Sequence, residues 1–169
     1  MGYDEHEQQA KQTPVRCSVV TVSDTRTVDT DTSGKLVRDL LTAAGHPLAE
    51  YQIVKDEPEQ LTSALEILAS NSDVIIFNGG TGISKRDSTV DTLVPLFEKR
   101  LPGFGEIFRV LSFSEIGAAA MLSRAEAGVF RDTIVFLTPG STNAVRLAME
   151  RLIVPQLKHL VWEILRQKT

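Results

Sequence analysis

The stretch VIIFNGGTGISKRDSTVDTL, from Val74 to Leu93, contains the residues whose types and spacing most clearly suit chemistry. An apolar run becomes glycine-rich between Asn78 and Gly82, and an acid, Asp87, follows before the chain turns helical. Free backbone N–H groups in such a loop can bind an anion such as phosphate. A carboxylate beside phosphate needs a cation between them, and Mg²⁺ is typically bound by one or two carboxylates plus substrate phosphates. The stretch indicates either a phosphate and magnesium site or a tight turn that needs only glycine's backbone freedom.

Two common phosphate-binding motifs are excluded for this loop. A Walker A motif ends in G-K-[ST], and the dinucleotide fingerprint needs a glycine where Lys85 stands. A second acid, Asp56, follows another apolar run and could join Asp87 at a metal. The alternatives are a solvated loop position or a cap before Pro58 for Asp56, and a favourable place near the start of the next helix for Asp87.

The hydrophobic pattern predicts strands that alternate with helices. Apolar runs rich in β-branched residues predict buried strands over residues 15–22, 73–77 and 133–138, and residues 49–54 are predicted to form a further strand. The segments between them carry apolar residues at helical spacing. This order predicts an α/β fold, with helices on both faces of a parallel or mostly parallel sheet.

Capping residues and prolines predict where several helices begin and end. Ser33 and Ser88 are each placed to cap a helix, and Pro58 lies where a first helical turn tolerates proline. Pro95 is expected to bend or shorten the helix that Ser88 begins. Pro155 is expected to interrupt the helical pattern before a last helix.

Polar residues follow all four predicted strands. In open α/β sheets, ligands bind beyond the carboxyl ends of the strands, so these residues are expected to share one edge. In chain order, the four groups are Ser23, Asp24, Asp29 and Asp31; then Asp56; then Asn78, Gly79, Gly80, Thr81, Gly82 and Asp87; then Pro139, Gly140 and Ser141.

The overall composition fits one soluble domain. The chain has 169 residues, 42% of them hydrophobic, a net charge of −4 and no long basic run, so nothing favours nucleic-acid binding. Residues 1–13 are polar and aperiodic and predict a disordered tail before a single domain over 14–169. The tail is not a signal peptide, and the longest apolar run, 116–122, is too short to span a bilayer, so we expect a cytoplasmic protein without a membrane partner. The single cysteine, Cys17, is expected to be a buried core thiol.

The segment NGGTGISKRDST, residues 78–89, resembles the G-G-T-G-x-x-x-R-D-x-T signature of the molybdenum cofactor biosynthesis family that includes MoaB and MogA. Further stretches agree and cover nearly the whole chain after the tail: TVSDTR, DTSG, IVKDE, PGFGEIFRVLSF, EIGAAAMLSRA and PGSTNAVRLAMERLI. The resemblance is closest to the single-domain MoaB branch. Asn78 stands where threonine often precedes the glycines, and its amide can still make hydrogen bonds within the loop.

The resemblance implies a three-layer α/β/α sandwich with a mostly parallel sheet, assembled as a homotrimer or homohexamer. Active members join the terminal phosphate of molybdopterin to AMP from Mg-ATP and release pyrophosphate. This implies a molybdopterin adenylyltransferase, a nucleotidyltransferase with Mg²⁺ as cofactor and ATP and molybdopterin as substrates. The alternative is a protein that binds molybdopterin or a pathway intermediate without catalysis, because some MoaB-type members keep the fold and lose the activity. Contact with other proteins of the cofactor pathway is a further expectation.

The resemblance also implies roles for individual residues. The acids of adenylylating relatives match Asp56 and Asp87, which are expected to be catalytic and to bind the metal. Inactive members depart at the positions that match Asp56 or the Arg86–Asp87 pair, so the presence of both acids in this chain favours the enzyme. The expected substrate-binding residues, from the resemblance or from their place after a strand, are Ser23, Asp24, Asn78, Gly79, Gly80, Thr81, Gly82, Ser112, Ser123, Pro139, Gly140 and Ser141.

Two arginines and one apolar region keep more than one interpretation. Arg109 and Arg124 could each pair with phosphate or join salt bridges between helices or subunits. The region from Phe104 to Met121 is rich in apolar residues, and part of its surface is expected to pack against another subunit.

Overall fold

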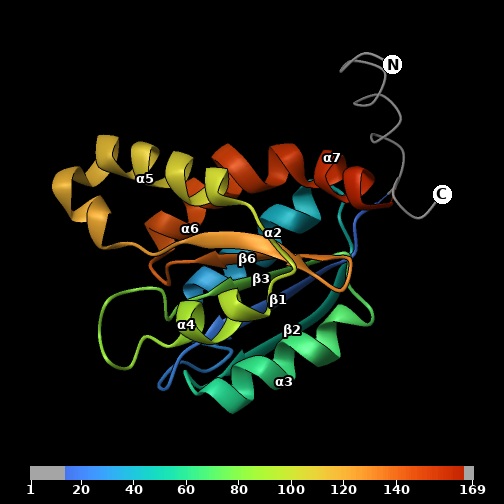
Figure 1. Cartoon of the computed structure of the whole chain (residues 1–169), viewed down its shortest axis with the longest axis horizontal. Coiled ribbons are helices and arrows are strands. Elements are labelled where there is room, and N and C mark those ends of the chain that lie inside the picture. Colours follow the sequence, from blue (N-terminus) through green and yellow to red (C-terminus); the bar gives the residue numbers. More distant parts are fainter. Residues whose placement is uncertain (1–13, 166–169) are drawn as a thin grey trace.

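A six-stranded sheet forms the centre of the molecule in the computed structural model, which describes residues 14–165 (Figure 1). The strands lie in the order β2-β1-β3-β6-β5-β4. The strands β2, β1, β3 and β6 are parallel, β5 is antiparallel to its neighbours β6 and β4, and β4 therefore runs in the same direction as the parallel strands. The sheet is therefore mostly parallel, as predicted. The bounds are β1 (Cys17–Val22), β2 (Leu48–Val54), β3 (Val74–Asn78), β4 (Lys99–Arg100), β5 (Glu126–Phe130) and β6 (Thr133–Thr138).

Helices cover both faces of the sheet and make three layers. In Figure 1, α3 and α4 lie below the sheet, and α5, α6 and α7 lie above it. The predicted three-layer α/β/α sandwich is confirmed. None of the described helices is long and apolar enough to cross a membrane. The helices are α2 (Thr32–Ala43), α3 (Pro58–Ala69), α4 (Thr89–Leu93), α5 (Pro102–Ile116), α6 (Thr142–Ala148) and α7 (Val154–Leu165), with 3-10 segments η1 (Val94–Leu96) and η2 (Gly117–Leu122) and a π segment η3 (Met149–Ile153).

Two hydrophobic cores, one on each face, explain why β3 has no polar alternation. Val74 and Ile76 belong to the core beneath α2, α5, α6 and α7. Ile75 and Phe77 belong to the core beneath α3 and α4. Because successive side chains of a strand point to opposite faces, a strand covered on both faces must be apolar at every position.

The structure corrects one predicted helix cap and changes the role of another. The N-cap of α2 is Asp31, whose side chain accepts a hydrogen bond from the Gly34 N–H at 2.9 Å, and Ser33 lies inside the helix. Ser88 occupies the N-cap position of α4, as predicted, but its side chain makes no capping hydrogen bond, and its hydroxyl donates to Asp56 Oδ1 at 2.6 Å instead. Each serine hydroxyl donates to a residue distant in the sequence: Ser33 to Asn78 Oδ1 at 2.9 Å, and Ser88 to Asp56 Oδ1.

The prolines have a milder effect than expected at one of two positions. The helix that begins at α4 ends after five residues and continues as η1, so the predicted shortening at Pro95 is confirmed. Pro155 does not separate two helices, because α6 leads through the π segment η3 directly into α7. Pro155 is the second residue of α7, and a π segment changes the hydrogen-bonding pattern where proline lacks an N–H.

Candidate functional site

The carboxyl ends of β1, β2, β3 and β6 share one edge of the sheet, because these strands are parallel and in register. At this edge the glycine loop after β3 touches the turn after β6. The Gly79 N–H donates to Thr138 O at 2.9 Å, and a β-carbon on Gly140 would lie 3.2 Å from the Gly79 α-carbon. The structure therefore brings two of the predicted segments into direct contact.

Two glycines of the loop are required by its backbone geometry. Gly79 has φ +112° and Gly80 has φ +68°, which side-chain-bearing residues rarely adopt. A β-carbon on Gly79 would collide with the carbonyl oxygen of Val22. One on Gly80 would lie 2.5 Å from Asp56 Oδ2 and closer still to Thr89 Oγ1. Glycine at position 80 therefore allows both the tight turn of the loop and the close approach of Asp56.

The backbone of the loop presents donors that nothing in the described protein uses. The N–H groups of Gly80, Thr81 and Gly82 make no hydrogen bond to any residue between 14 and 165. Unpaired N–H groups on successive residues are the usual means by which a loop binds an anion. The following helix, α4, has only five residues, so the loop amides, not a long helix dipole, would carry such a site.

Asp56 and Asp24 tie this loop to the two neighbouring strand ends. Asp56 Oδ1 accepts hydrogen bonds from the Ser88 N–H at 3.1 Å and from its hydroxyl at 2.6 Å. The Asp56 N–H donates to Asp24 Oδ1 at 3.3 Å, and Asp24 is also paired with Arg86 of the loop. The exits of β1, β2 and β3 are therefore linked through two carboxylates.

Asp87 lies within the same loop. Its Oδ2 accepts a hydrogen bond from the Ser84 N–H at 2.9 Å and faces Gly82. Among the described residues, Asp56 Oδ2 and Asp87 Oδ1 accept no hydrogen bond, so each acid keeps one oxygen available. The described part of the chain has no cluster of three or more protein metal ligands. A divalent cation bound by Asp56 and Asp87 would also need oxygen atoms from a bound substrate. Mg²⁺ is typically bound in this way, by one or two carboxylates and the phosphates of a substrate.

Arg124 and Arg109 stabilise the backbone around the site. Arg124 donates from Nε to Gly82 O at 2.9 Å and from Nη2 to Asp87 O at 3.2 Å, and it pairs with Asp91 at 2.8 Å. Arg109 Nη1 donates to Ala125 O at 2.9 Å. Of the two interpretations left open, these contacts favour a structural role for both guanidinium groups.

The two serines predicted from the resemblance take different places. Ser123 is beside the glycine loop, because the next residue donates from its N–H to Thr81 O at 3.0 Å. Ser112 is buried in α5, and its hydroxyl makes no hydrogen bond to the other described site residues. The ligand roles of both remain predictions.

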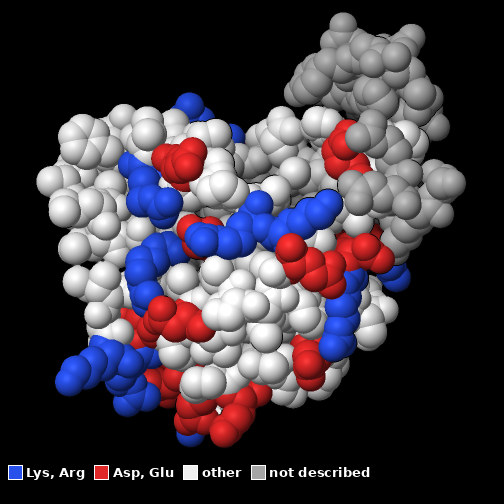
Figure 2. Space-filling view, in the orientation of Figure 1, with Lys and Arg blue, Asp and Glu red and all other residues white. Residues whose placement is uncertain are grey.

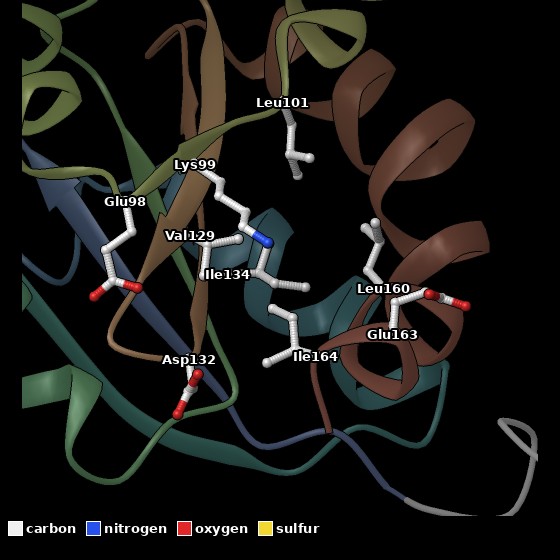
Figure 3. Close-up of a pocket in the computed structure, with 9 residues that line it drawn as sticks. All are labelled: Glu98, Lys99, Leu101, Val129, Asp132, Ile134, Leu160, Glu163 and Ile164. Carbon is white, nitrogen blue, oxygen red and sulfur yellow. The ribbon is translucent and has the colours of Figure 1, made fainter. Parts of the chain in front are cut away.

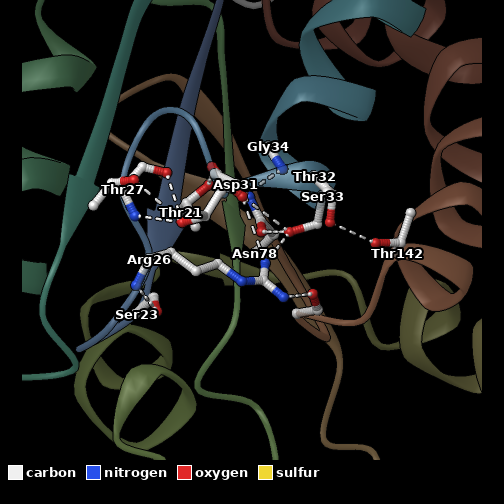
Figure 4. A network of polar contacts seen from close by, with 12 residues as sticks. Thr21, Ser23, Arg26, Thr27, Asp31, Thr32, Ser33, Gly34, Asn78 and Thr142 are labelled. Atoms are coloured by element: carbon white, nitrogen blue, oxygen red, sulfur yellow. Dashed lines mark hydrogen bonds and ion pairs between the residues drawn. The ribbon is translucent and has the colours of Figure 1, made fainter.

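A buried polar network around Asp31 connects the ends of β1 and β3 to the first turn of α2 (Figure 4). Asp31 is 1% exposed and accepts hydrogen bonds from Thr21 Oγ1 at 2.5 Å and Tyr51 OH at 2.6 Å. Burial by itself would raise the pKa of Asp31, but hydrogen bonds from Thr21, Tyr51, Gly34 and Ser33 outweigh it and hold the pKa below its ordinary value. Burial, and then the bond to Asp31, raise the pKa of Tyr51 to about 12.

The same network positions Arg26, a residue that the motif comparison did not single out. Its guanidinium lies 3.5 Å from Asp31 Oδ1, donates to Ser33 Oγ, and donates to Gly140 O at 3.3 Å. Ser33 in turn donates to Asn78 Oδ1 at 2.9 Å. Arg26 thus spans from the end of β1 to the turn after β6. Its place directly after a predicted strand, in SDTR, was the signal in the sequence.

Two hollows differ in their relation to this edge. An open hollow of about 600 Å³ adjoins the ends of β1 and β2 and is lined by Ser23, Arg26, Tyr51 and Lys55, among others. A smaller one of about 210 Å³ lies near the opposite end of β6, between β4, β5 and α7, with mostly apolar walls (Figure 3). The larger hollow contains predicted site residues and the smaller one contains none.

Comparisons with known proteins agree with this architecture. Residues 18–159 match the family described as "Probable molybdopterin binding domain". The chain is 53% identical to the molybdenum cofactor biosynthesis protein B of Bacillus subtilis (strain 168), over 99% of this chain and 100% of that protein. A crystal structure of a molybdenum cofactor biosynthesis protein B superposes with a TM-score of 0.88 at 48% identity, over 92% of this chain and 98% of that one. The tungsten cofactor synthesizing protein MoaB from Pyrococcus furiosus superposes at 0.78 with 37% identity, over 91% and 96%.

The fold and its polar edge define an α/β/α domain with a candidate anion site beyond the parallel strands. The matches over nearly the full length are more specific than the fold. The chain belongs to the molybdopterin-binding family of molybdenum cofactor biosynthesis proteins, and within it to the MoaB branch.

Proposed function

We propose that the protein binds molybdopterin and adenylylates its terminal phosphate with Mg-ATP, as a step in molybdenum cofactor biosynthesis. The family supports the pterin ligand. One observation supports catalysis most directly: the loop with three unpaired amides approaches Asp56 at Gly80 and Asp87 at Gly82, and each acid keeps one carboxylate oxygen that accepts no hydrogen bond from a described residue.

In the proposed reaction, a phosphate oxygen of molybdopterin attacks the α-phosphorus of ATP, and the bond to pyrophosphate breaks as the new P–O bond forms. The N–H groups of Gly80 to Gly82 would hold phosphate oxygens. Asp56 and Asp87 would hold Mg²⁺, which neutralises the phosphate charge when bound. Such transfers depend on positioning and electrostatic stabilisation, so no serine or cysteine nucleophile is needed.

The open hollow beside the ends of β1 and β2 is a suitable place for the rest of the pterin. It borders Ser23 and Asp24 of the predicted site and contains two basic side chains, Arg26 and Lys55, that could meet an anionic group. The Asp31 network restricts Arg26, so the cost in side-chain entropy of binding there is reduced.

The experiment is Mg-ATP-dependent pyrophosphate release by the purified protein with molybdopterin. Asp87→Asn should retain the fold, because the amide oxygen can still accept from the Ser84 N–H, and should lose turnover by several orders of magnitude. Asp56→Asn should likewise lose turnover while pterin binding, measured without Mg-ATP, survives. Asp39→Asn, at an exposed acid on α2, is the matched control and should keep full activity.

Two results would contradict the enzymatic proposal. A fully active Asp87→Asn protein would refute the metal role of that acid. Wild-type protein that binds molybdopterin tightly but shows no Mg-ATP-dependent turnover, under conditions where a known relative is active, would make the protein a non-catalytic binding protein.

We also propose that the protein self-associates through an apolar face on α5 and η2. Phe104 and Phe108 pack into the core with Phe136, so they do not form this face. Figure 2 shows few charges on the part of the surface over the outer end of α5. The exposed large apolar residues of α5 and η2 are Ile107, Val110, Phe113, Ile116, Met121 and Leu122. Contiguous apolar surface of this kind commonly marks an interface.

Sedimentation tests the assembly. Wild-type protein should sediment as a trimer or hexamer of the 18.6 kDa chain, and a monomer at micromolar concentration would contradict the proposal. Phe113→Glu, at a side chain 61% exposed, should dissociate it. Ile67→Glu is the matched control, because Ile67 is equally exposed but lies on α3 on the other side of the sheet.

A further inference from the structure

Thr89 carries a buried hydroxyl that has no hydrogen-bond partner. The residue is 0% exposed, and its Oγ1 is one of three such buried side-chain atoms among the described residues, with Glu126 Oε2 and Trp162 Nε1. The large majority of buried polar side-chain atoms have a partner, so an exception in a native protein calls for an explanation. Of the three, Thr89 is the one at the candidate site.

The geometry around Gly80 shows what this hydroxyl faces. A β-carbon added to Gly80 would be 2.5 Å from Asp56 Oδ2 and still closer to Thr89 Oγ1, so the two oxygens flank the same glycine. The Thr89 N–H donates to Gly80 O at 3.2 Å, which fixes the threonine backbone against the loop. The hydroxyl and the available carboxylate oxygen are therefore the two atoms nearest to the position where Gly80 lacks a side chain.

The hydroxyl is closed to solvent, which restricts what it can do. A group that water cannot reach is not placed to meet a ligand directly, so any function must act through a neighbour. The neighbouring acceptor without a hydrogen bond is Asp56 Oδ2, since Oδ1 already accepts two hydrogen bonds from Ser88. Thr89 can act on Asp56 in the way that Ser88 does.

We propose that Thr89 is a positioning residue for Asp56: its hydroxyl donates to Oδ2 when the carboxylate binds a divalent cation. Ser88 and Thr89 then hold one carboxylate oxygen each and fix the plane of the group. This inference rests on the proposed function, because it requires the cation that Asp56 is proposed to bind. Carboxylates that ligate metals are themselves hydrogen-bonded, and loss of such a partner commonly weakens metal binding about 10- to 100-fold.

The test measures Mn²⁺ binding in the presence of ATP by electron paramagnetic resonance, together with thermal unfolding without metal. Thr89→Val should raise the Kd for Mn²⁺ about 10- to 100-fold. Its melting temperature without metal should equal or exceed that of the wild type, because an unpaired buried hydroxyl is replaced by a methyl group of similar size. Thr89→Ser should restore Mn²⁺ binding to near the wild-type Kd.

Thr133→Val supplies the opposite signature as a control. The Thr133 hydroxyl is buried and donates to Ser72 O at 3.0 Å, far from the site, so this change should lower the melting temperature and leave the Kd for Mn²⁺ unchanged. Wild-type protein that binds Mn²⁺ with ATP while Thr89→Val binds it equally well would overturn the role of Thr89 alone. If Thr89→Val does not fold, Thr89→Ser decides, because it keeps the hydroxyl. A Thr89→Ser protein that binds Mn²⁺ as weakly as Asp56→Asn does would overturn the role of the Thr89 hydroxyl. Failure of the wild type to bind Mn²⁺ with ATP would overturn the proposed function and this inference together.

Discussion

The Asp31 network predicts a large, pH-dependent contribution to stability. Replacing Asp31 with Asn keeps the shape of the side chain but removes its charge and turns one acceptor oxygen into an NH₂ group. Oδ2 accepts hydrogen bonds from Thr21 and Tyr51, and Oδ1 accepts one from the Gly34 N–H. With the NH₂ group at the Oδ1 position, the Gly34 N–H meets another donor; with it at the Oδ2 position, the Thr21 and Tyr51 hydroxyls lose their charged acceptor.

The expected loss follows from the strength of such bonds. Hydrogen bonds to a charged group contribute about 1.5–3 kcal/mol each, against about 0.5–1.5 kcal/mol for neutral pairs. Two bonds to Oδ2 that become neutral or are lost, together with the 3.5 Å ion pair to Arg26, give a decrease of about 2–4 kcal/mol in the free energy of unfolding of Asp31→Asn at pH 7. Asp39→Asn removes an exposed i,i+4 pair and should change it by less than about 0.5 kcal/mol.

The pH dependence has a defined sign. The folded-state pKa of Asp31 is lower than its ordinary value, which is about 3.9 in an unfolded chain. The stabilisation is therefore fully present above that pH and is lost as the pH falls through the folded-state pKa. The difference between wild type and Asp31→Asn should be constant from pH 7 to 5 and should shrink below about pH 4.

The assay is guanidinium denaturation followed by far-ultraviolet circular dichroism at fixed protein concentration, at pH 7, 5, 4 and 3. Asp39→Asn is measured in parallel. If Asp31→Asn were no less stable than Asp39→Asn at pH 7, the network would contribute nothing. A difference that stays the same down to pH 3 would show that the charge of Asp31 is not its source.

Three further predictions concern the site and the core. Gly79→Ala should lower the free energy of unfolding by at least about 2 kcal/mol, because φ is +112° and the new methyl group would meet a backbone carbonyl. Gly103→Ala is the control and should not lower it by this amount, because the space around Gly103 is open. Equal denaturation midpoints for the two variants would contradict this prediction. Arg124→Ala should speed tryptic cleavage of the exposed loop several-fold, since two loop carbonyls lose their donor, and unchanged cleavage rates would count against the structural role. Burial raises the pKa of the Cys17 thiol to about 12, so a thiol reagent should modify it only after unfolding; rapid modification of native protein would refute its place in the core.

The amino-acid pattern alone predicted the four parallel strands and the layered fold. A strand that is apolar at every position, such as Val74 to Phe77, is stable only when both of its faces are covered. The composition of such a run therefore predicts helices on both faces of the sheet. The short antiparallel strands β4 and β5 were not predicted. A two-residue strand and a glycine-containing EAGVF segment have no periodicity to detect. The strand β5 pairs with β6 at the edge of the parallel strands, and β4 in turn pairs with β5.

The place of the candidate site was predicted from the same pattern, because the carboxyl ends of parallel strands share one edge of the sheet and the polar residues follow those ends. The partners of its side chains did not follow. Ser88 was expected to cap its own helix, yet it donates to Asp56, 32 positions earlier in the chain. Arg124 was equally suited to a ligand or to a carboxylate, and the loop carbonyl that it binds is 42 positions away.

By itself, the sequence determined the class of fold and the family, and it predicted the edge of the sheet at which a ligand binds, because these depend on local periodicity and on residue type. Only the tertiary structure decided that Asp31 is buried beneath that edge, that Arg26 reaches the turn after β6, and that the Thr89 hydroxyl lies beside Asp56 without a bond of its own. The physical reason is that hydrogen bonds are short and directional, so their partners depend on strand register and loop path, which no single segment of the chain encodes.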